Sequence, residues 1–439
     1  MLDKLLDKKK IKRVVGIGCI WSLTFVLTGC SILSNNPKKV AENKKIVASP
    51  AAAVEISFWN PFGGGEGEFV ERIVQDFNTS QKDVYVKQLR LESNEYYVKL
   101  STALSSGKGP DVAVAHVDRM SPFVKAKQIM PLDELASEVG FDFKDLEESN
   151  VRSVSFMSKP YALPLDTHFH MLYYNKAIMK KAGLLNDDET PKLAMSTPEA
   201  FIQMLQQIQV TVPNVEPFAV NTPYFQEPFL NMYYQAGGEL LDVSKAKVTI
   251  HNDKSLRVLK FYQQIYASKL SDVNDKTPWD TFHNGKAALW MGGVWEAGYH
   301  LSESSLPAGI MPLPTLFGSS MQWGSSHTLV IPSYVTKDKQ RAAMAFMSYF
   351  SKVGSMLWGQ AGHVPANRAV LQSQAYKQLP YRKLFIEAQH QVKFAPQTDN
   401  YATMFTTLSE ELQSIVMGGM DPEEGLVQLE KKMNSVLAN

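Results

Sequence analysis

Apolar and polar residues follow regular patterns along the chain from residue 54 onward. They alternate over 54–58 and again over 83–88, and this period of two predicts strands. After each of these segments, apolar side chains recur every three or four residues, which predicts helices with one buried face. These predicted helices cover 69–77 and 97–104. Residues 112–115 are apolar throughout, like a strand covered on both sides. The alternation predicts an α/β lobe with a largely parallel sheet.

A second series of strands and helices follows residue 160, and the last third of the chain is mostly helical in pattern. Strands are predicted at 161–165, 169–175, 215–220, 287–291 and 328–331. Two helix starts are marked by a capping residue, a Pro and acidic residues, at Thr197-Pro198-Glu199 and Asp421-Pro422-Glu423-Glu424. Residues 252–268 form another predicted helix, with apolar side chains on one side. This series predicts a second α/β lobe.

The N-terminal 30 residues have the pattern of an export signal. A basic stretch precedes an apolar one of about 15 residues, which is too short to span a bilayer as a helix. The run that follows, Leu27-Thr28-Gly29-Cys30, resembles a bacterial lipobox, in which Cys becomes the lipid-modified first residue of the mature protein. We therefore expect residues 1–29 to be removed and Cys30 to anchor the chain to the membrane. Residues 30–53, rich in polar residues and Ala, are expected to form a flexible tether.

Composition excludes several classes of function. Without residues 1–29, which hold six of the 45 basic and two of the 44 acidic residues, 39 basic and 42 acidic residues remain. This balance offers no basic surface for nucleic acid. The chain has two cysteines, Cys19 in the removed segment and Cys30, so the mature protein has no free thiol for a disulfide, a zinc site or a nucleophile. The remaining length of about 410 residues suggests two domains.

Candidate metal ligands are few. Asp166, His168 and His170 share one face if their segment is a strand. No second cluster of His or carboxylates in the sequence completes a metal site, so we expect no metal and no cofactor, and we interpret these residues as polar groups at the mouth of a cleft. Tyr pairs such as Tyr233-Tyr234 could hold ferric iron, but they are more typical of one core and one surface ring. Motifs of hydrolases and nucleotide-binding enzymes are absent from the sequence.

Aromatic residues suggest a sugar ligand. Trp59 ends the first predicted strand, at the edge where α/β sheets present ligands. Trp295 and Trp323 lie beside Gly and polar residues at expected turns. Aromatic rings stack on the C–H face of a sugar, and charged acceptors bind its hydroxyl groups.

Several short segments strengthen this interpretation, and they occur in a characteristic order. They are Phe58-Trp59-Asn60, Gly109–Val112, Tyr161–His168 with Tyr173–Lys176, Asn284–Ala288 with Gly292–Trp295, Ser326–Thr328 and Gly362–Pro365. Together they resemble the extracellular solute-binding proteins of carbohydrate ABC importers, the group that includes maltose-binding protein.

The resemblance implies a two-lobed periplasmic-binding-protein fold of type II, α/β in class. Each lobe would be a mostly parallel sheet flanked by helices, and a hinge would close the lobes on the ligand. The N-terminal lobe would comprise 54–167 and 286–317, and the C-terminal lobe 168–285 and 318–439. The chain would cross between the lobes near 166–170, Gly285 and 315–320.

The resemblance also implies a binding site. The expected ligand-binding residues are Trp59, Asn60, Asp118, Asp166, His168, Tyr234, Trp295, Glu296, Trp323, His327 and His363. Asp118 matches a family position that binds sugar hydroxyls, whereas Asp166 and His168 lie at the hinge and either bind ligand or support it. The family aromatic near the third strand is Ala115 here, which argues against maltose itself.

The expected function is capture of a sugar, most simply an oligosaccharide, for a transmembrane permease, by a monomer without catalytic residues. Alternatives are a different ligand (ferric iron, a polyamine or a peptide) or a secreted carbohydrate-active enzyme with Asp118, Asp166 or Glu296 as its carboxylates. Ser31 after the anchor Cys, where the family pattern of inner-membrane lipoproteins has Asp, favours the extracellular face of a Gram-positive-type cell.

Overall fold

The computed structural model describes residues 53–438 apart from 193–195, 245 and 303. The expected signal peptide, Cys30 and all but the last residue of the expected tether lie outside this range. Within the described part of the chain, no helix is both long enough and apolar enough to cross a bilayer.

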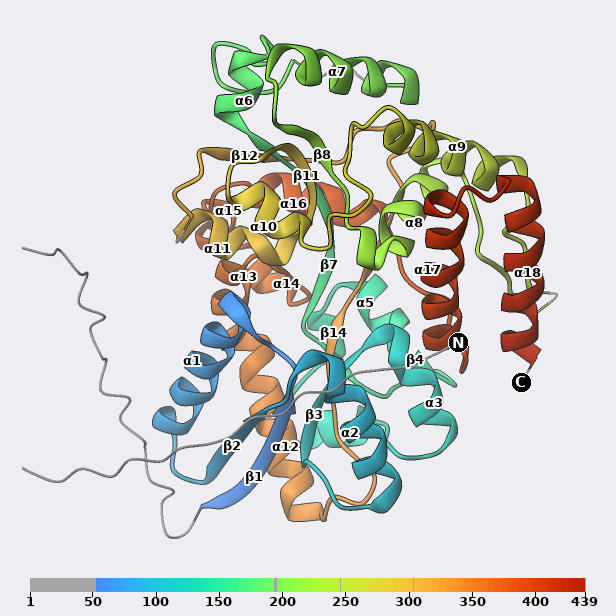
Figure 1. Ribbon diagram of the computed structural model, residues 1–439. Coiled ribbons are helices and arrows are strands. Elements are labelled where there is room, and N and C mark those ends of the chain that lie inside the picture. Colours follow the sequence, from blue (N-terminus) through green and yellow to red (C-terminus); the bar gives the residue numbers. More distant parts are fainter. Residues whose placement is uncertain (1–52, 193–195, 245, 303, 439) are drawn as a thin grey trace, which may run out of the picture. The chain divides into compact units, whose positions relative to one another are not determined.

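The first sheet has five strands in the order β2-β1-β3-β14-β6. The strands are β1 (Val54–Asn60), β2 (Val84–Arg90), β3 (Val112–His116), β6 (Leu163–Pro164) and β14 (His327–Val330). β1 is parallel to β2 and β3, whereas β14 is antiparallel to β3 and β6. Figure 1 shows β14, from late in the sequence, beside the N-terminal strands.

Helices cover this sheet, and two of them, α1 (Gly64–Ser80) and α2 (Ser93–Ser106), contain the apolar faces predicted at 69–77 and 97–104. The others are α3 (Met120–Lys125), α4 (Asp133–Glu138), α5 (Glu148–Ser153), α12 (Lys337–Tyr349) and α13 (Ser355–Ala361), beside a short hairpin of β4 (Ser155–Phe156) and β5 (Lys159–Pro160). Ile73 and Phe77 of α1 are buried in the core, as their four-residue spacing predicts. Phe346 of α12 packs on Phe58 of β1, with ring centroids 5.2 Å apart.

The second sheet has seven strands, centred on the ten-residue strand β7 (Asp166–Asn175), every residue of which is buried. The others are β8 (Glu216–Ala219), β11 (Ala287–Gly293), β12 (Ala308–Met311), β13 (Gln322–Ser325), β15 (Val364–Pro365) and β16 (Val392–Lys393). β7 pairs antiparallel with β11, β12, β13 and β15, and the pairs β11–β8 and β13–β16 are parallel.

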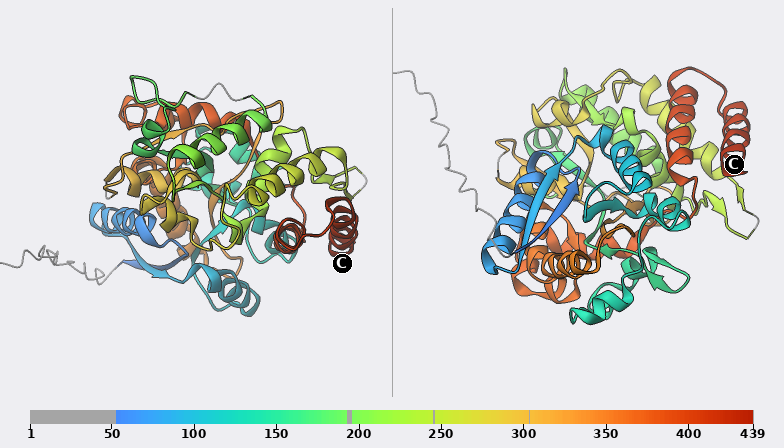
Figure 2. Two further views of the ribbon diagram at one scale, coloured as in Figure 1. Left: turned by 45° about the horizontal axis from the view of Figure 1, so that its top comes forward. Right: turned by 90° about the horizontal axis from the view of Figure 1, so that it is seen from below.

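A larger set of helices packs around this second sheet. They are α6 (Lys176–Lys181), α7 (Pro198–Thr211), α8 (Gln226–Gln235), α9 (Asp253–Ala267), α10 (Pro278–His283), α11 (Ala297–Ser302), α14 (Arg368–Gln372), α15 (Gln374–Lys377), α16 (Arg382–Ala388), α17 (Tyr401–Met417) and α18 (Pro422–Ala438), with a hairpin of β9 (Leu241–Asp242) and β10 (Lys247–Val248). Figure 2 shows α17 and α18 side by side near the C-terminus.

The predicted helix starts are confirmed. The Thr197 hydroxyl accepts a hydrogen bond from the backbone N–H of Ala200 at 3.2 Å, and Asn252 caps α9 together with the side chain of Ser255. Asp421 accepts hydrogen bonds from the backbone N–H groups of the two glutamates that follow Pro422. Each cap satisfies N–H groups that have no partner within the helix.

Strand pairing corrects two of the expectations. Both sheets are mixed rather than mostly parallel. Residues 286–317, expected in the N-terminal lobe, supply β11 and β12 to the seven-stranded sheet, and residues 327–330, expected in the C-terminal lobe, supply β14 to the five-stranded sheet. Local periodicity identifies a strand but not its partners, which depend on contacts between distant segments.

The chain passes between the two sheets at three places. It leaves β6 and enters β7 at Leu165–Asp166, within the region expected near 166–170. It leaves β13 and enters β14 at Ser326, and it returns from α13 to β15 at Gly362–His363. The crossings expected at Gly285 and 315–320 are wrong, because the strands that flank them, β8, β11, β12 and β13, all belong to the seven-stranded sheet.

Candidate functional site

A pocket of about 740 Å³ opens among elements that flank both sheets. Its lining residues are Pro61, Phe62, Glu66, Tyr97, Val98, His116, Asp118, Arg119, His168, Pro223, Tyr224, Gln226, Glu227, Trp295, Trp323, Ser325, His327, Phe405, Thr406, Ser409, Glu410 and Gln413. Pockets of this size hold small organic ligands. The lining combines aromatic rings with carboxylates, amides and hydroxyl groups, so it can both stack against and hydrogen-bond a polar ligand.

Five of the expected site residues line this pocket. They are Asp118, His168, Trp295, Trp323 and His327. They come from five different elements of the chain: the turn after β3, β7, the turn after β11, β13 and the start of β14. The pocket therefore collects side chains that are more than 200 positions apart in the sequence.

Two tryptophans form an aromatic wall. Trp295 follows Gly293, and a Cβ on that glycine would lie 2.2 Å from the Trp295 ring, so the ring can lie over the backbone only because residue 293 is Gly. Trp323 stacks on Phe405 of α17, with centroids 6.0 Å apart and an angle of 18° between the planes. His168 lies against the Trp295 ring, edge to face, at 5.6 Å.

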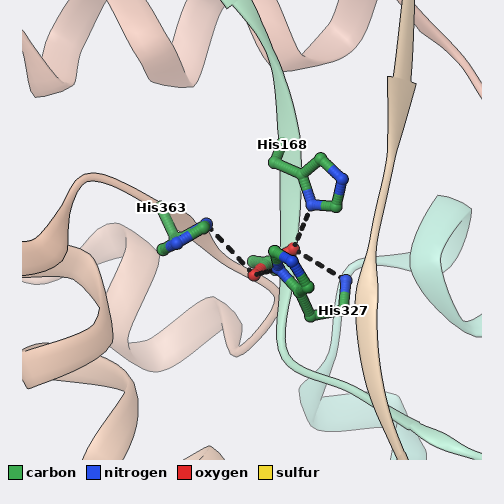
Figure 3. A group of neighbouring side chains, drawn as sticks. His168, His327 and His363 are labelled. Atoms are coloured by element: carbon green, nitrogen blue, oxygen red, sulfur yellow. Dashed lines mark hydrogen bonds and ion pairs between the residues drawn. The ribbon is translucent and has the colours of Figure 1, made fainter. Parts of the chain in front are cut away.

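Beside the pocket, Asp166 is the centre of a buried polar cluster. His168 Nδ1 lies 3.1 Å from its Oδ1, and His327 Nδ1 and Trp358 Nε1 lie 2.7 and 2.6 Å from its Oδ2. The backbone N–H of His327 donates to Oδ1 at 3.1 Å. His363 Nδ1 is 3.2 Å from Oδ2. Figure 3 shows the side chains of His168, His327 and His363 gathered around this carboxylate.

Burial and charge set the ionisation of this cluster. Burial opposes ionisation of Asp166, but attraction to His327 and His363 and hydrogen bonds from its neighbours hold its pKa well below the usual range. Burial lowers the pKa of His327 to about 4 and that of His363 to about 3. Burial, together with the charge of Asp166, raises the pKa of Glu66 to about 8. Near pH 7, Asp166 is therefore a buried carboxylate, and His327 and His363 are neutral.

Six expected site residues do not line the pocket. Asp166 and His363 lie in the buried cluster. Asn60 is fully buried, and its Oδ1 accepts a hydrogen bond from the Phe62 backbone N–H at 3.2 Å. Trp59 packs against the core of the five-stranded sheet, and Tyr234 lies in the core of the seven-stranded sheet. Glu296 accepts a hydrogen bond from Trp279 Nε1 at 2.8 Å.

Other pocket residues were missed by the sequence analysis. His116 is the last residue of β3, so the rule that places ligands at the carboxyl ends of strands could have found it. Its backbone N–H donates to the Tyr97 hydroxyl at 2.8 Å, and burial lowers the pKa of its imidazole well below the usual range. Glu66, Glu227 and Phe405 carry no signal in the sequence, because helix packing alone brings them to the pocket.

Comparison with known proteins identifies the family. The family model described as bacterial extracellular solute-binding protein matches residues 72–383. The chain belongs to this family. Its members bind solutes for ABC importers and are not enzymes, so the alternative of a carbohydrate-active enzyme is set aside.

Two relatives match most of this chain in sequence, and a solved structure shares its fold. The arabinooligosaccharide-binding protein of Bacillus subtilis (strain 168) is 24% identical over 381 residues, 81% of this chain and 80% of the relative. The sn-glycerol-3-phosphate-binding periplasmic protein UgpB of Brucella abortus (strain 2308) is 22% identical, over 94% and 98% of the two chains. The GacH receptor of Streptomyces glaucescens GLA.O superposes with a TM-score of 0.78 at 19% identity, covering 88% of this chain and 99% of that one.

We expect the Glu296 carboxyl to make stability depend on pH. Burial raises its pKa from 4.5 to about 7, although the hydrogen bond from Trp279 opposes this shift. The Glu296 carboxyl therefore binds its proton more tightly in the folded solute-binding protein than in the unfolded chain. Its contribution to stability is fully present below about pH 4.5 and is lost as the pH rises through 7. Glu296→Gln should match the wild type in thermal unfolding at pH 4.5 and be the more stable at pH 8. If the difference in unfolding temperature between Glu296→Gln and the wild type is the same at pH 4.5 and pH 8, the expectation is wrong.

Gly362 holds the turn that carries His363 into the cluster. Its φ is +132°, and a Cβ there would lie 2.1 Å from the Val294 carbonyl oxygen. Gly362→Ala adds backbone strain and a collision, so it should lower the free energy of unfolding by about 3 kcal/mol in chemical denaturation. Gly318→Ala is the matched control, because φ is +106° there but no atom lies within 4 Å of the added Cβ. It should cost about 1 kcal/mol. If both variants lose the same unfolding free energy, the collision with the Val294 carbonyl contributes nothing to the loss in Gly362→Ala.

Proposed function

We propose that this solute-binding protein captures an uncharged oligosaccharide in the pocket and delivers it to the permease of an ABC importer. The aromatic wall of Trp295 and Trp323, facing carboxylates and amides such as Asp118 and Gln226, is the observation that carries this proposal. Rings bind the apolar faces of sugar units, while these acceptors and donors bind the hydroxyl groups. The similarity to a protein named for arabinooligosaccharide binding supports the same ligand class.

The charge of the pocket favours a sugar over a phosphorylated solute. Four carboxylate residues line it, Glu66, Asp118, Glu227 and Glu410, against a single Lys or Arg among its lining residues. That one cation, Arg119, lies 3.8 Å from Asp118 and over the Tyr97 ring, so its charge is already partly balanced. Phosphate sites are built from Arg or Lys clamps or helix N-termini. A polyamine is the second candidate, because its ammonium groups would suit the acidic residues of the pocket, although the pKa of one of them, Glu66, is raised to about 8.

We propose that the two sheets mark two lobes, divided differently from the sequence expectation. The N-terminal lobe would comprise 54–165 and 327–361, and the C-terminal lobe 166–326 and 362–438. Pocket residues come from both, so a ligand that contacts both would favour closure by its difference in affinity for the closed and open states. The three crossing segments would form the hinge.

We propose that the mature protein is monomeric, begins at Cys30 and is held by lipid on the extracellular face of a Gram-positive-type cell. The lipobox-like run before Cys30 and Ser31 after it support this assignment. Replacing Cys30 with Ala should release the protein into the medium, which fractionation of cells expressing both forms would reveal. Recovery of the wild-type protein in an outer-membrane fraction would contradict the proposal.

The ligand class can be tested by thermal shift and calorimetry on the purified full chain in EDTA. Arabino-, malto- and chito-oligosaccharides would be compared with sn-glycerol-3-phosphate, putrescine and ferric citrate, the last without EDTA. A ligand at a hundredfold excess over its dissociation constant stabilises the folded state by about 2.7 kcal/mol. One oligosaccharide should raise the unfolding temperature. A shift with glycerol phosphate, putrescine or iron alone would refute the sugar proposal.

A further inference from the structure

The cluster of Asp166, His168, His327 and His363 has a composition that the sugar proposal does not explain. All four side chains are buried, and one nitrogen or carboxylate oxygen from each lies within 4.8 Å of those of the other three. Figure 3 shows the three imidazoles approaching one carboxylate from different segments of the chain. Sugar binding would require at most the two histidines that reach the pocket, His168 and His327.

His363 has an unusual environment in this cluster. Its ring is fully buried, and its Nδ1 makes no hydrogen bond with any described residue although Asp166 Oδ2 is 3.2 Å away. Its Nε2 lies 2.7 Å from Glu66 Oε1. With the proton on Nε2 and donated to Glu66, the Nδ1 lone pair faces a carboxylate oxygen. If Glu66 carries the proton instead, His363 Nδ1 holds a hydrogen but still makes no hydrogen bond to Asp166. Either arrangement leaves a buried polar atom unsatisfied.

A metal ion would resolve this contact. Three imidazole nitrogens and one carboxylate oxygen are a common ligand set for Zn²⁺, and ligands about 2.0–2.1 Å from a tetrahedral ion lie about 3.3 Å from one another. His327 Nδ1 and His363 Nδ1 lie 2.7 and 3.2 Å from Asp166 Oδ2, and His168 Nδ1 lies 3.1 Å from the other oxygen, Oδ1. The ligand atoms of all four residues lie within 4.8 Å of one another. The carboxylate of Glu66 on the outer nitrogen of His363 matches the carboxylate–histidine–metal arrangement that orients zinc ligands.

We propose that Asp166, His168, His327 and His363 bind one divalent transition-metal ion of the zinc type, separately from the sugar. The ligands stand at the three places where the chain passes between the sheets, so a bound ion joins the crossing segments to one another. His168 and His327 also line the pocket, which gives the ion a route to the cluster. The site is not evident in the sequence, because these ligands are up to 197 positions apart and only Asp166 and His168 are close to each other along the chain.

The test uses the purified full chain stripped with EDTA and dialysed. Equilibrium dialysis against ZnCl₂, followed by elemental analysis, should give one ion per chain, and the unfolding temperature should rise with added Zn²⁺. Addition of Co²⁺ should give the intense visible absorption of a tetrahedral ion with nitrogen and oxygen ligands. This spectrum is measured on the wild type, so it needs no variant to fold. No bound ion, or a weak spectrum of octahedral type, would overturn the proposal.

Histidine variants inside and outside the cluster determine where the ion binds. His168→Gln, at the pocket wall, and His363→Gln should each weaken Zn²⁺ binding at least tenfold, which is about the loss seen on disturbing even outer-sphere partners. His300→Gln, a buried histidine outside the cluster, and His251→Gln, a surface histidine beside Glu423, are the controls and should bind like the wild type. Loss of the ion in His251→Gln alone would assign it to the surface. Sugar binding is measured separately in EDTA, so either proposal can fail without the other.

Discussion

Replacing Asp166 with Asn should lower the free energy of unfolding by about 3–5 kcal/mol, the usual effect of removing one partner of a buried charge network. The substitution keeps the size of the side chain but exchanges one oxygen for an NH₂ group. Both oxygens accept from N–H groups whose hydrogens are fixed, the His327 backbone at Oδ1 and the Trp358 indole at Oδ2. Either orientation of Asn therefore sets a donor against a donor in a site without water-exposed surface.

Chemical denaturation of the metal-free protein measures this effect, because EDTA removes any contribution from a bound ion. Asp118→Asn is the matched control. Asp118 lines the pocket and is partly exposed, so its loss should leave the unfolding free energy nearly unchanged while weakening sugar binding. If Asp166→Asn unfolds within about 0.5 kcal/mol of the wild type, the cluster does not hold the crossing segments together.

Much of the secondary structure could be predicted from the sequence. The spacing of Phe69, Ile73 and Phe77 identifies α1, and the uninterrupted apolar run at 112–115 identifies β3, whose first four residues are buried. These features are local, since they arise from the period of a single element and the face it buries. The lobe boundaries are not local. β14 joins the five-stranded sheet through pairing with β3, some 210 positions earlier, and no periodicity in either strand encodes that partner.

The site could be predicted only in part, because some of its residues are brought together by contacts between distant segments. Trp295 and Trp323 could be anticipated from their chemistry, and both line the pocket, but only Trp295 lies at the expected turn, because Trp323 is part of strand β13. Trp59 and Asn60 sit at the expected edge of the first sheet, but Asn60 is fully buried with its Oδ1 bonded to the Phe62 backbone N–H, and neither residue lines the pocket. The buried cluster could not be predicted, because three separate crossings between the sheets bring His327 and His363 to Asp166.

Trp295→Ala should raise the dissociation constant for the sugar roughly 30-fold, a loss of about 2 kcal/mol typical of a buried aromatic contact in a binding site. Trp295 is half-buried, and it lines the pocket next to His168. Calorimetric titration with the oligosaccharide found in the ligand screen measures the effect. Trp295→Phe keeps an aromatic face and should recover part of the affinity, which a purely structural role for the indole would not predict.

Trp279→Ala is the matched control for this experiment. Trp279 is also half-buried and stacks on His283 at 4.2 Å, but it does not line the pocket. Its removal should reduce stability and leave sugar affinity within about twofold of the wild type, since non-contacting residues away from the pocket add little to binding energy. Equal losses of affinity in both variants would mean that the Trp295 effect comes from disturbed packing. Unchanged affinity in Trp295→Ala would place the sugar against Trp323 and Phe405 instead, or outside this pocket.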